Sequence, residues 1–305
     1  MKSLQELEPV AAKLLDRHLA TSKEWFPHEL VPYHRGRDFD GSAWSPDDAD
    51  FGGAEIDERV RSALFVNLLT EDNLPYYFRD IERMFGQDGA FATWSRRWTA
   101  EEGRHSIVIR DYLTATRAVD PVALERARMA QVSGGEVPQP DDPWRGMAYV
   151  ALQELATRIS HRNTGKLIGD PVGYELMARV AADENQHFLF YRDLTTAALE
   201  LDPSTMVIAI DEMVCNFAMP GEGIVDFSRH SKAIAAAGIY DLAVHHDQIL
   251  QPVVIRQWAV DKLTGLSGEA EKAREHLLSF IERLGRIAQR LTARRLERTT
   301  TVSAT

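Results

Sequence analysis

The 305-residue chain contains a single cysteine, Cys215. One cysteine excludes an internal disulfide framework, a zinc site built on cysteine ligands and a self-contained iron–sulfur cluster. Basic residues are also in the minority, because 35 Lys and Arg stand against 46 Asp and Glu, a net charge of −11. This acidic balance argues against a general nucleic-acid binder.

The sequence also lacks any run of eighteen apolar residues, so it predicts no membrane span. The first twenty residues, MKSLQELEPVAAKLLDRHLA, contain acidic residues where a signal or transit peptide has none. We therefore expect a protein of a reducing compartment, with a cytoplasmic location.

Strand-like alternation is absent over any useful length, and helical spacing recurs along the chain instead. Within residues 2–20, for example, apolar residues return every three or four positions. Residues 26–54 are rich in Pro and Gly and predict a loop. The sequence thus predicts an all-α protein with a single domain over 1–298 and a disordered tail over 299–305. Its further helices are expected at 55–85, 90–118, from about 121 to 131, 144–168, 172–200, 204–218, 229–237, 245–264 and 267–298.

Two Glu-x-x-His motifs stand 82 residues apart, one at Glu102 and His105 and the other at Glu184 and His187. Residues at positions i and i+3 lie on the same face of a helix, about 4.5 Å apart along its axis. One such motif occurs often by chance in a helical protein. Two of them are more specific, although an exposed Glu/His pair remains the alternative for each motif alone.

The spacing of two further glutamates strengthens the interpretation. Glu71 lies 31 residues before the first motif, and the midpoint falls in the glycine-containing turn 86–89. Glu154 lies 30 residues before the second motif, and the midpoint is Gly169. Residues equidistant from the turn of an antiparallel helical hairpin lie at the same height. Each hairpin should therefore place a lone glutamate opposite a Glu-x-x-His motif.

Stacking the two hairpins brings four carboxylates and two imidazoles to one level of a four-helix bundle. This is the ligand set of ferritin-like di-iron or di-manganese proteins. Two divalent cations would neutralise the four carboxylates, which would otherwise be costly to bury. Hard oxygen ligands with imidazole suit iron or manganese better than zinc.

Some details of this centre stay open in the sequence. Asp72 competes with Glu71 as a ligand, and Pro75 should open the helix at the carbonyl of Glu71. The acid before each motif is a candidate partner for a ligand histidine, because such histidines usually donate their second N–H to a carboxylate. We expect Asp183 to orient His105 and Glu101 to orient His187; the alternative is that these acids face solvent.

Seven segments carry a resemblance to a known family: TEDNLP (70–75), WSRRWTAEEGRH (94–105), QELATRISHRNTGK (153–166) and AADENQH (181–187), with KEWFPHELVP (23–32), MPG (219–221) and DKLTGLSGEAEKA (261–273). They resemble the soluble acyl-acyl-carrier-protein desaturases, and the sequence is most similar to the actinobacterial branch of that family. The similarity covers roughly residues 4–275. It implies a ferritin-like bundle elaborated with additional helices, two iron ions per chain, O2 as oxidant, ferredoxin as electron donor and a homodimer. The implied metal ligands are the six residues already derived: Glu71, Glu102, His105, Glu154, Glu184 and His187.

The resemblance also implies roles for three further residues. Trp25, Asp183 and His105 match the family's route for electrons, although core packing is the alternative for Trp25. Thr157 matches a threonine beside the oxygen-binding face. The segment YYFRDIERMF after Pro75 departs from the plant enzymes, which have smaller groups along the acyl channel. The length of the acyl chain and the position of the double bond therefore stay undetermined.

The predicted activity is O2-dependent desaturation of a fatty acyl chain carried as a thioester on acyl carrier protein. Other di-iron oxygenases, such as hydroxylases or N-oxygenases of carrier-bound substrates, are the alternative, and a ferroxidase is less favoured. A separate electron donor is needed, since one cysteine cannot hold an iron–sulfur relay.

Two predictions concern surfaces. The apolar stretches LFVNLL and AFATWSRRW carry apolar residues on more than one helix face, which favours a homodimer. A basic stretch over 272–298 is a candidate docking site for the acidic carrier protein, although its cations could instead pair with the protein's own acids. The cations are Lys272, Arg274, Arg283, Arg286, Arg290, Arg294, Arg295 and Arg298.

Overall fold

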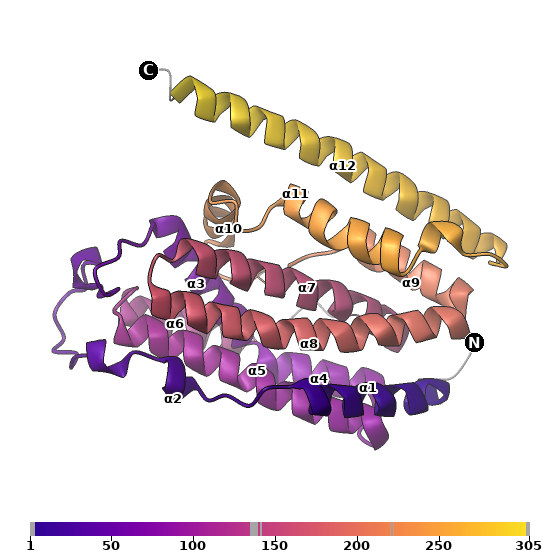
Figure 1. Cartoon of the computed structure of the whole chain (residues 1–305), viewed down its shortest axis with the longest axis horizontal. Helices are drawn as coiled ribbons and strands as arrows, with labels where there is room; N and C mark the ends of the chain where they lie inside the picture. Colours follow the sequence, from indigo (N-terminus) through magenta and orange to yellow (C-terminus); the bar gives the residue numbers. More distant parts are fainter. Residues whose placement is uncertain (1–3, 135–139, 141, 220, 222, 303–305) are drawn as a thin grey trace.

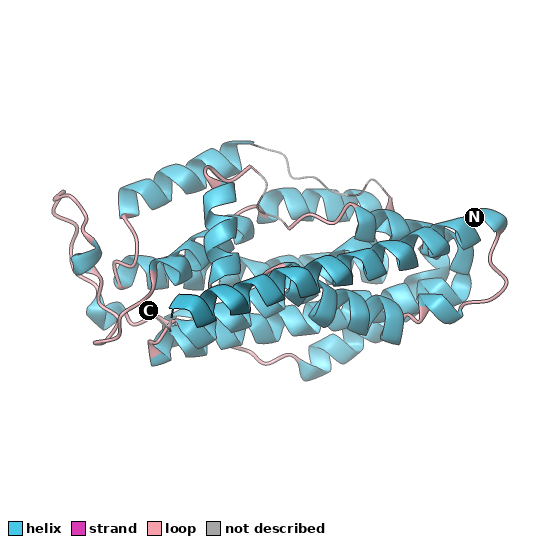
Figure 2. Ribbon diagram, turned by 90° about the horizontal axis from the view of Figure 1, so that it is seen from above, coloured by secondary structure: helices cyan, strands magenta, loops and turns pink. Residues whose placement is uncertain are grey.

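The computed structural model describes residues 4–134, 140, 142–219, 221 and 223–302, with the backbone alone from 294 onward. Over these ranges the chain is helical and contains no strand (Figures 1 and 2). The all-α prediction is thus confirmed. None of the helices in the described part is both long and apolar enough to cross a bilayer.

Four helices form the central bundle: α3 (Glu58–Glu71), α5 (Gly89–Ala115), α7 (Pro143–Leu167) and α8 (Pro171–Leu201). Helix α3 packs against α5 and α7, and α8 packs against the same two helices, so that the four close a ring. The turn between α7 and α8 is as the sequence predicts. Gly169 takes a positive φ of 74°, and the Asp170 side chain accepts a hydrogen bond from the backbone N–H of Val172 at the start of α8.

The expected helix over 55–85 is divided into two in the structure. Helix α3 ends at Glu71, and α4 (Leu74–Phe85) begins after Asp72 and Asn73. Pro75 explains the break, since it has no N–H to donate to the carbonyl of Glu71. The interruption leaves Glu71 at the last turn of α3.

Additional helices surround the bundle, and α12 runs along its outside for most of the molecule's length (Figure 1). Helices α1 and α4 pack on α5, α10 packs on α3, and α9 lies between α7 and α12. The remaining elements are η1 (Leu4–Leu7), α1 (Glu8–Thr21), α2 (Pro27–Leu30), η2 (Tyr33–Arg35), η3 (Pro46–Asp48), α6 (Pro121–Gly134), α9 (Pro203–Cys215), α10 (Phe227–Ala236), α11 (Leu242–His245), η4 (His246–Gln257), η5 (Val260–Lys262) and α12 (Gly268–Val302).

The region 245–264 is a second departure from the single regular helix that the sequence predicts. A short α11 leads into η4, a π-helix that contains Pro252, and Ala259 then adopts a left-handed conformation. The proline removes a backbone donor from the segment, and a wider helical turn is one way to accommodate that loss. Of the tail predicted over 299–305, residues 299–302 belong to α12, which continues to Val302, and residues 303–305 lie outside the described residues.

The apolar stretches that favoured a homodimer are covered within one chain. In LFVNLL, Leu64, Leu68 and Leu69 are at most 1% exposed, and in AFATWSRRW the side chains of Phe91 and Trp94 are at most 3% exposed. The additional helices cover the faces that we expected a second chain to cover. The argument for a dimer from these stretches is therefore wrong, and the dimer prediction depends on the family resemblance alone.

Candidate metal centre

The structure brings the six predicted ligands together inside the bundle. Glu71 is on α3, Glu102 and His105 are on α5, Glu154 is on α7, and the second motif is on α8. Every one of these side chains is buried. They form two overlapping groups whose ligand atoms lie within 4.8 Å of one another, and both groups share Glu102 and Glu184. The first group is Glu71, Glu102, His105 and Glu184; the second is Glu102, Glu154, Glu184 and His187.

Both motif histidines direct Nδ1 toward the carboxylates. The Nδ1 atom of His187 lies 2.8 Å from Oε1 of Glu102 and 3.5 Å from Oε2 of Glu154. The Nδ1 atom of His105 lies 3.3 Å from Oε2 of Glu102 and 3.7 Å from Oε2 of Glu71. Glu102 thus offers one oxygen to each half of the centre. This is the position of a carboxylate that could bridge two ions.

The hydrogen bonding of these atoms tests whether cations fit. Oε1 of Glu102, Oε2 of Glu154 and Nδ1 of both His105 and His187 are buried and make no well-aligned hydrogen bond among the described residues, although the Glu102 and His187 atoms lie only 2.8 Å apart. Buried polar atoms normally have a partner, because an unsatisfied one is costly. Four such atoms converging from three helices fit a centre that holds divalent cations. The donors are carboxylate oxygens and imidazole nitrogens, which suit iron or manganese.

The pKa values of the buried groups are shifted because several carboxylates lie close together. Burial, together with the nearby charge of Glu184, raises the pKa of Glu154 well above its ordinary value and also raises the pKa of Glu102. Burial alone would lower the pKa of His105, but the Glu102 carboxylate and its acidic neighbours raise that pKa well above the ordinary value. Protons therefore balance part of the charge in the metal-free protein, and binding of cations would displace them.

Each candidate ligand histidine has a carboxylate near its other nitrogen, in the pairs that the sequence predicts. Nε2 of His187 lies 2.9 Å from Oε2 of Glu101, and Nε2 of His105 lies 3.5 Å from Oδ2 of Asp183. The contact of His187 is a hydrogen bond and holds the direction of its Nδ1, whereas Nε2 of His105 is only close to Asp183 and makes no hydrogen bond among the described residues. Oε2 of Glu101 also lies 3.0 Å from Nε2 of His18. Nothing in the sequence indicated that His18 belongs to this site.

Trp25 lies next to the carboxylate of Asp183. Its indole N–H donates to Oδ2 of Asp183 over 2.7 Å, and its ring stacks on His105 with 6.4 Å between centroids and 11° between planes. The guanidinium of Arg104 lies 4.8 Å from the centre of the Trp25 ring and also contacts Asp183. Trp25, Asp183 and His105 are thus in continuous contact from the edge of the bundle to the candidate metal centre.

The choice between Glu71 and Asp72 is decided by where the side chains point. Asp72 forms a two-point ion pair with Arg128 of α6, with distances of 2.5 and 2.9 Å. Glu71 points into the bundle toward His105. The geometry therefore favours Glu71 as the candidate ligand.

Sequence reasoning missed two more buried residues at this site. His161 of α7 lies 3.1 Å from Oε1 of Glu71 and 3.3 Å from Oε1 of Glu184. A signal for it existed, because His161 is seven residues after Glu154 and a spacing of seven returns to the same helix face. Trp98 donates its indole N–H to Oε1 of Glu154 over 3.0 Å. It is four residues before Glu102, again on one face.

Thr157 connects the centre with a cavity. It lies one turn after Glu154, and its hydroxyl donates to the carbonyl of Glu154 over 3.0 Å. A cavity of about 80 Å³ adjoins it, between α3, α7 and α10. A larger cavity of about 830 Å³ lies beside this one, toward α9 and α12. The two cavities share three lining residues: Met219, Ser231 and Tyr240.

Comparisons with known proteins agree with this geometry. A family model described as "Fatty acid desaturase" matches residues 1–305. DesA1 of Mycobacterium tuberculosis, named as an acyl-acyl-carrier-protein desaturase, is 41% identical over 295 residues, which cover 93% of this chain and 86% of the relative. The chloroplast palmitoyl-acyl-carrier-protein 4-desaturase of Coriandrum sativum is 32% identical, over 78% of this chain and 66% of its own length.

A solved structure extends the comparison to the fold. The X-ray structure of DesA2 from Mycobacterium tuberculosis H37Rv matches with a TM-score of 0.70 and 27% identity, over 88% of this chain and 98% of that one. The likeness supports the ferritin-like bundle that the ligand spacing predicts. Together with the family match and the identity to DesA1, it shows that the chain belongs to the fatty acid desaturase family.

Proposed function

We propose that the protein desaturates a fatty acyl chain carried as a thioester on acyl carrier protein, with O2 as oxidant at a centre of two iron ions. The observation that carries this proposal is the pair of overlapping ligand groups beside an apolar cavity. Removing hydrogen from an unactivated alkyl chain needs a stronger oxidant than any side chain supplies, and bound iron with O2 supplies it. The names of the relatives support the same substrate class.

In this proposal each ion takes one half of the centre. Glu71 and His105 would hold one ion, Glu154 and His187 would hold the other, and Glu102 and Glu184 would bridge both. Two divalent cations balance the four carboxylates, so the buried centre becomes neutral once both histidines are uncharged. The outer carboxylates of Glu101 and Asp183 would keep the imidazoles in the tautomer that presents Nδ1 to the metal.

Electrons would arrive from outside the chain. Ferredoxin is the proposed donor, because the single cysteine cannot hold an iron–sulfur cluster. Trp25, Asp183 and His105 would form the route, which is supported by their unbroken contact. In this role Trp25 transfers electrons, whereas Asp183 holds His105 in position.

The two adjoining cavities are the proposed channel for the acyl chain. The small one places an alkyl chain beside Thr157, and the larger one has the volume of a typical ligand pocket. Apolar side chains such as Phe217, Phe280 and Leu284 line it and would exclude water. Exposed Lys232 of α10 also lines the larger cavity, and a cation there suits an acidic carrier protein.

The basic stretch of α12 contributes less to this docking than its composition suggests. Arg274 and Arg286 pair with acids of their own helix, Glu271 and Glu282. Arg290 contacts the carbonyl of Arg286 instead. The side chains of Arg294, Arg295 and Arg298 lie outside the described residues. We therefore propose that carrier docking involves Lys232 and Arg290, near the cavity between α10 and α12.

Products distinguish this proposal from other di-iron chemistry. Iron-loaded protein is incubated with acyl carrier proteins of several chain lengths, O2, ferredoxin and a reductant, and the acyl products are analysed by mass spectrometry. Desaturation removes two hydrogen atoms, whereas hydroxylation adds one oxygen atom. A hydroxylated product would replace the proposal by an oxygenase, and iron oxidation without any acyl product would favour a ferroxidase. The homodimer and the cytoplasmic location stay predictions; sedimentation at micromolar concentration tests the first.

A further inference from the structure

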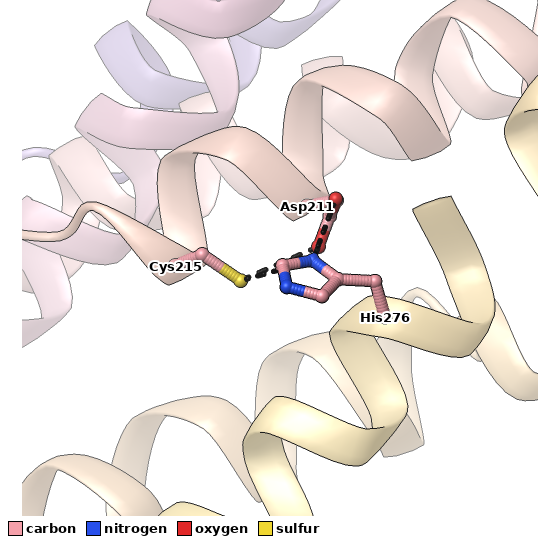
Figure 3. Close-up of side chains that lie close together, drawn as sticks. All are labelled: Asp211, Cys215 and His276. Atoms are coloured by element: carbon pink, nitrogen blue, oxygen red, sulfur yellow. Dashed lines mark hydrogen bonds and ion pairs between the residues drawn. The ribbon is translucent and has the colours of Figure 1, made fainter. Parts of the chain in front are cut away.

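A second cluster of metal-ligating side chains lies far along the chain from the six residues above. Asp211 and Cys215 are four residues apart on α9 and share a face of that helix. His276 of α12 points at both of them across the helix interface (Figure 3). A single cysteine excludes a zinc site built on several cysteines, but it does not exclude a site in which one cysteine is joined by other ligand types. The tertiary structure brings two other ligand types to that cysteine.

The three ligand atoms converge on one point. Nδ1 of His276 lies 2.8 Å from Oδ1 of Asp211 and 3.8 Å from Sγ of Cys215, and that sulfur lies 3.3 Å from the same Oδ1. In a tetrahedral zinc site, Zn–N and Zn–O bonds of about 2.0 Å and Zn–S bonds of about 2.3 Å place the ligand atoms roughly 3.3–3.6 Å apart. The three distances observed average 3.3 Å, so shifts of about half an ångström would suffice.

Other roles for this cluster fit the geometry less well. In a Cys–His–Asp catalytic arrangement the acid and the nucleophile contact opposite nitrogens of the imidazole. Here both face Nδ1 of His276. A simple polar contact between helices does not require three different ligand atoms at one point.

From this geometry we propose that Asp211, Cys215 and His276 bind one zinc-class divalent cation, with water as the fourth ligand. A thiolate and a carboxylate together balance the charge of the cation, and a set with sulfur suits zinc rather than the iron of the carboxylate centre. The His276 side chain is 61% exposed, which leaves a side open to solvent. This site does not depend on the proposed function.

The cation would fasten α12 to α9. Cys215 of α9 and Phe280 of α12 line the same large cavity, and His276 is one turn before Phe280. The site therefore lies at a wall of the cavity proposed as the acyl channel. Binding of zinc would link α12 to α9 at this wall.

Cobalt(II) provides a specific test, because Cys215 is the only thiol in the chain. Titration of the reduced full-length protein with Co²⁺ should produce a thiolate-to-cobalt charge-transfer band that reaches one equivalent and is displaced by Zn²⁺. Carboxylate and imidazole ligands cannot produce that band, so cobalt in the carboxylate centre does not interfere. Cys215→Ser should abolish the band, and Asp211→Asn or His276→Gln should weaken cobalt binding roughly tenfold or more.

Controls separate this site from the carboxylate centre. His34→Gln removes an exposed histidine on η2 and should leave the band unchanged. Glu102→Ala should also leave it unchanged, although that variant impairs the first centre. A reduced protein without a thiolate band at saturating cobalt would overturn the proposal. A band that is insensitive to both Asp211→Asn and His276→Gln would overturn it equally, because it would report a thiolate acting alone.

Discussion

The hydrogen bond from Trp98 to Glu154 gives a quantitative test of the candidate metal centre. Trp98 is 3% exposed, and its indole N–H donates to Oε1 of Glu154, while Oε2 of Glu154 has no hydrogen-bond partner in the described part of the chain. We propose that Oε2 is the metal-binding atom. Trp98→Phe keeps an aromatic ring in place but removes the donor.

The cost of this substitution should depend on whether metal is bound. The smaller ring loses roughly 40 Å³, which costs about 1 kcal/mol at ~24 cal/mol per Å³ of cavity. Burial raises the pKa of Glu154 well above its ordinary value, which favours the neutral carboxyl when no metal is bound, and a hydrogen bond to a neutral acceptor contributes about 1 kcal/mol. With metal bound, the acceptor is a carboxylate and the bond contributes about 2 kcal/mol. The extra 1 kcal/mol should weaken metal binding roughly fivefold.

Trp144→Phe is the matched control. Trp144 is also buried, at 5% exposure, and lies ten residues before Glu154 on the same helix, about 15 Å away along its axis. Urea unfolding of the metal-free proteins should show a loss of about 2 kcal/mol for Trp98→Phe and about 1 kcal/mol for Trp144→Phe. Only Trp98→Phe should weaken binding of Fe(II). Equal losses of stability and unchanged Fe(II) affinity in both variants would refute the reasoning.

Three further predictions follow from the same structure. After reconstitution with Fe(II), the wild-type protein should contain two iron ions per chain, and the Glu184→Ala variant should contain clearly fewer. A wild-type content near one iron ion per chain would contradict the two-ion proposal. Trp25→Phe should keep metal content and lower ferredoxin-driven turnover more than turnover with a chemical reductant, and equal impairment would remove its role in electron transfer. Burial lowers the pKa of His245 to about 4, below the unfolded value of about 6.5, so its contribution to stability is present above pH 6.5 and is lost as pH falls toward 4. Between pH 7 and pH 5 we expect the free energy of unfolding, measured with urea, to fall by about 2 kcal/mol because of His245, and His245→Gln should remove this decrease. An equal dependence of the unfolding free energy on pH in the variant would refute the assignment.

Docking of the carrier protein is tested by charge reversal near the larger cavity. Lys232→Glu with Arg290→Glu should raise KM for the acyl carrier protein and flatten its dependence on salt, because the Debye length is only about 8 Å at physiological ionic strength. Iron content should not change. Arg96→Glu, an exposed site on α5, is the control. An unchanged KM would place the docking surface elsewhere.

The sequence by itself predicted the parts of this protein that depend on local spacing. A Glu-x-x-His motif fixes two side chains on one helix face wherever the helix lies. Glu71 and the first motif are equally far from the turn between them, and so are Glu154 and the second motif. These spacings predicted the height of each glutamate in the bundle. For the same reason His161, seven residues after Glu154, was also within reach of sequence reasoning.

Only the tertiary structure decided features whose partners come from distant segments. Asp72 and Glu71 are neighbours in the chain, and it is Arg128 of α6 that draws Asp72 away from the bundle. The cavities beside Thr157 and the meeting of Cys215 with His276 depend on how α9, α10 and α12 pack. Helical periodicity shows which face of a helix is apolar, but it does not show which other helix will cover that face. Only the packing between helices determines which faces meet, and therefore where cavities form and which side chains from distant segments come together.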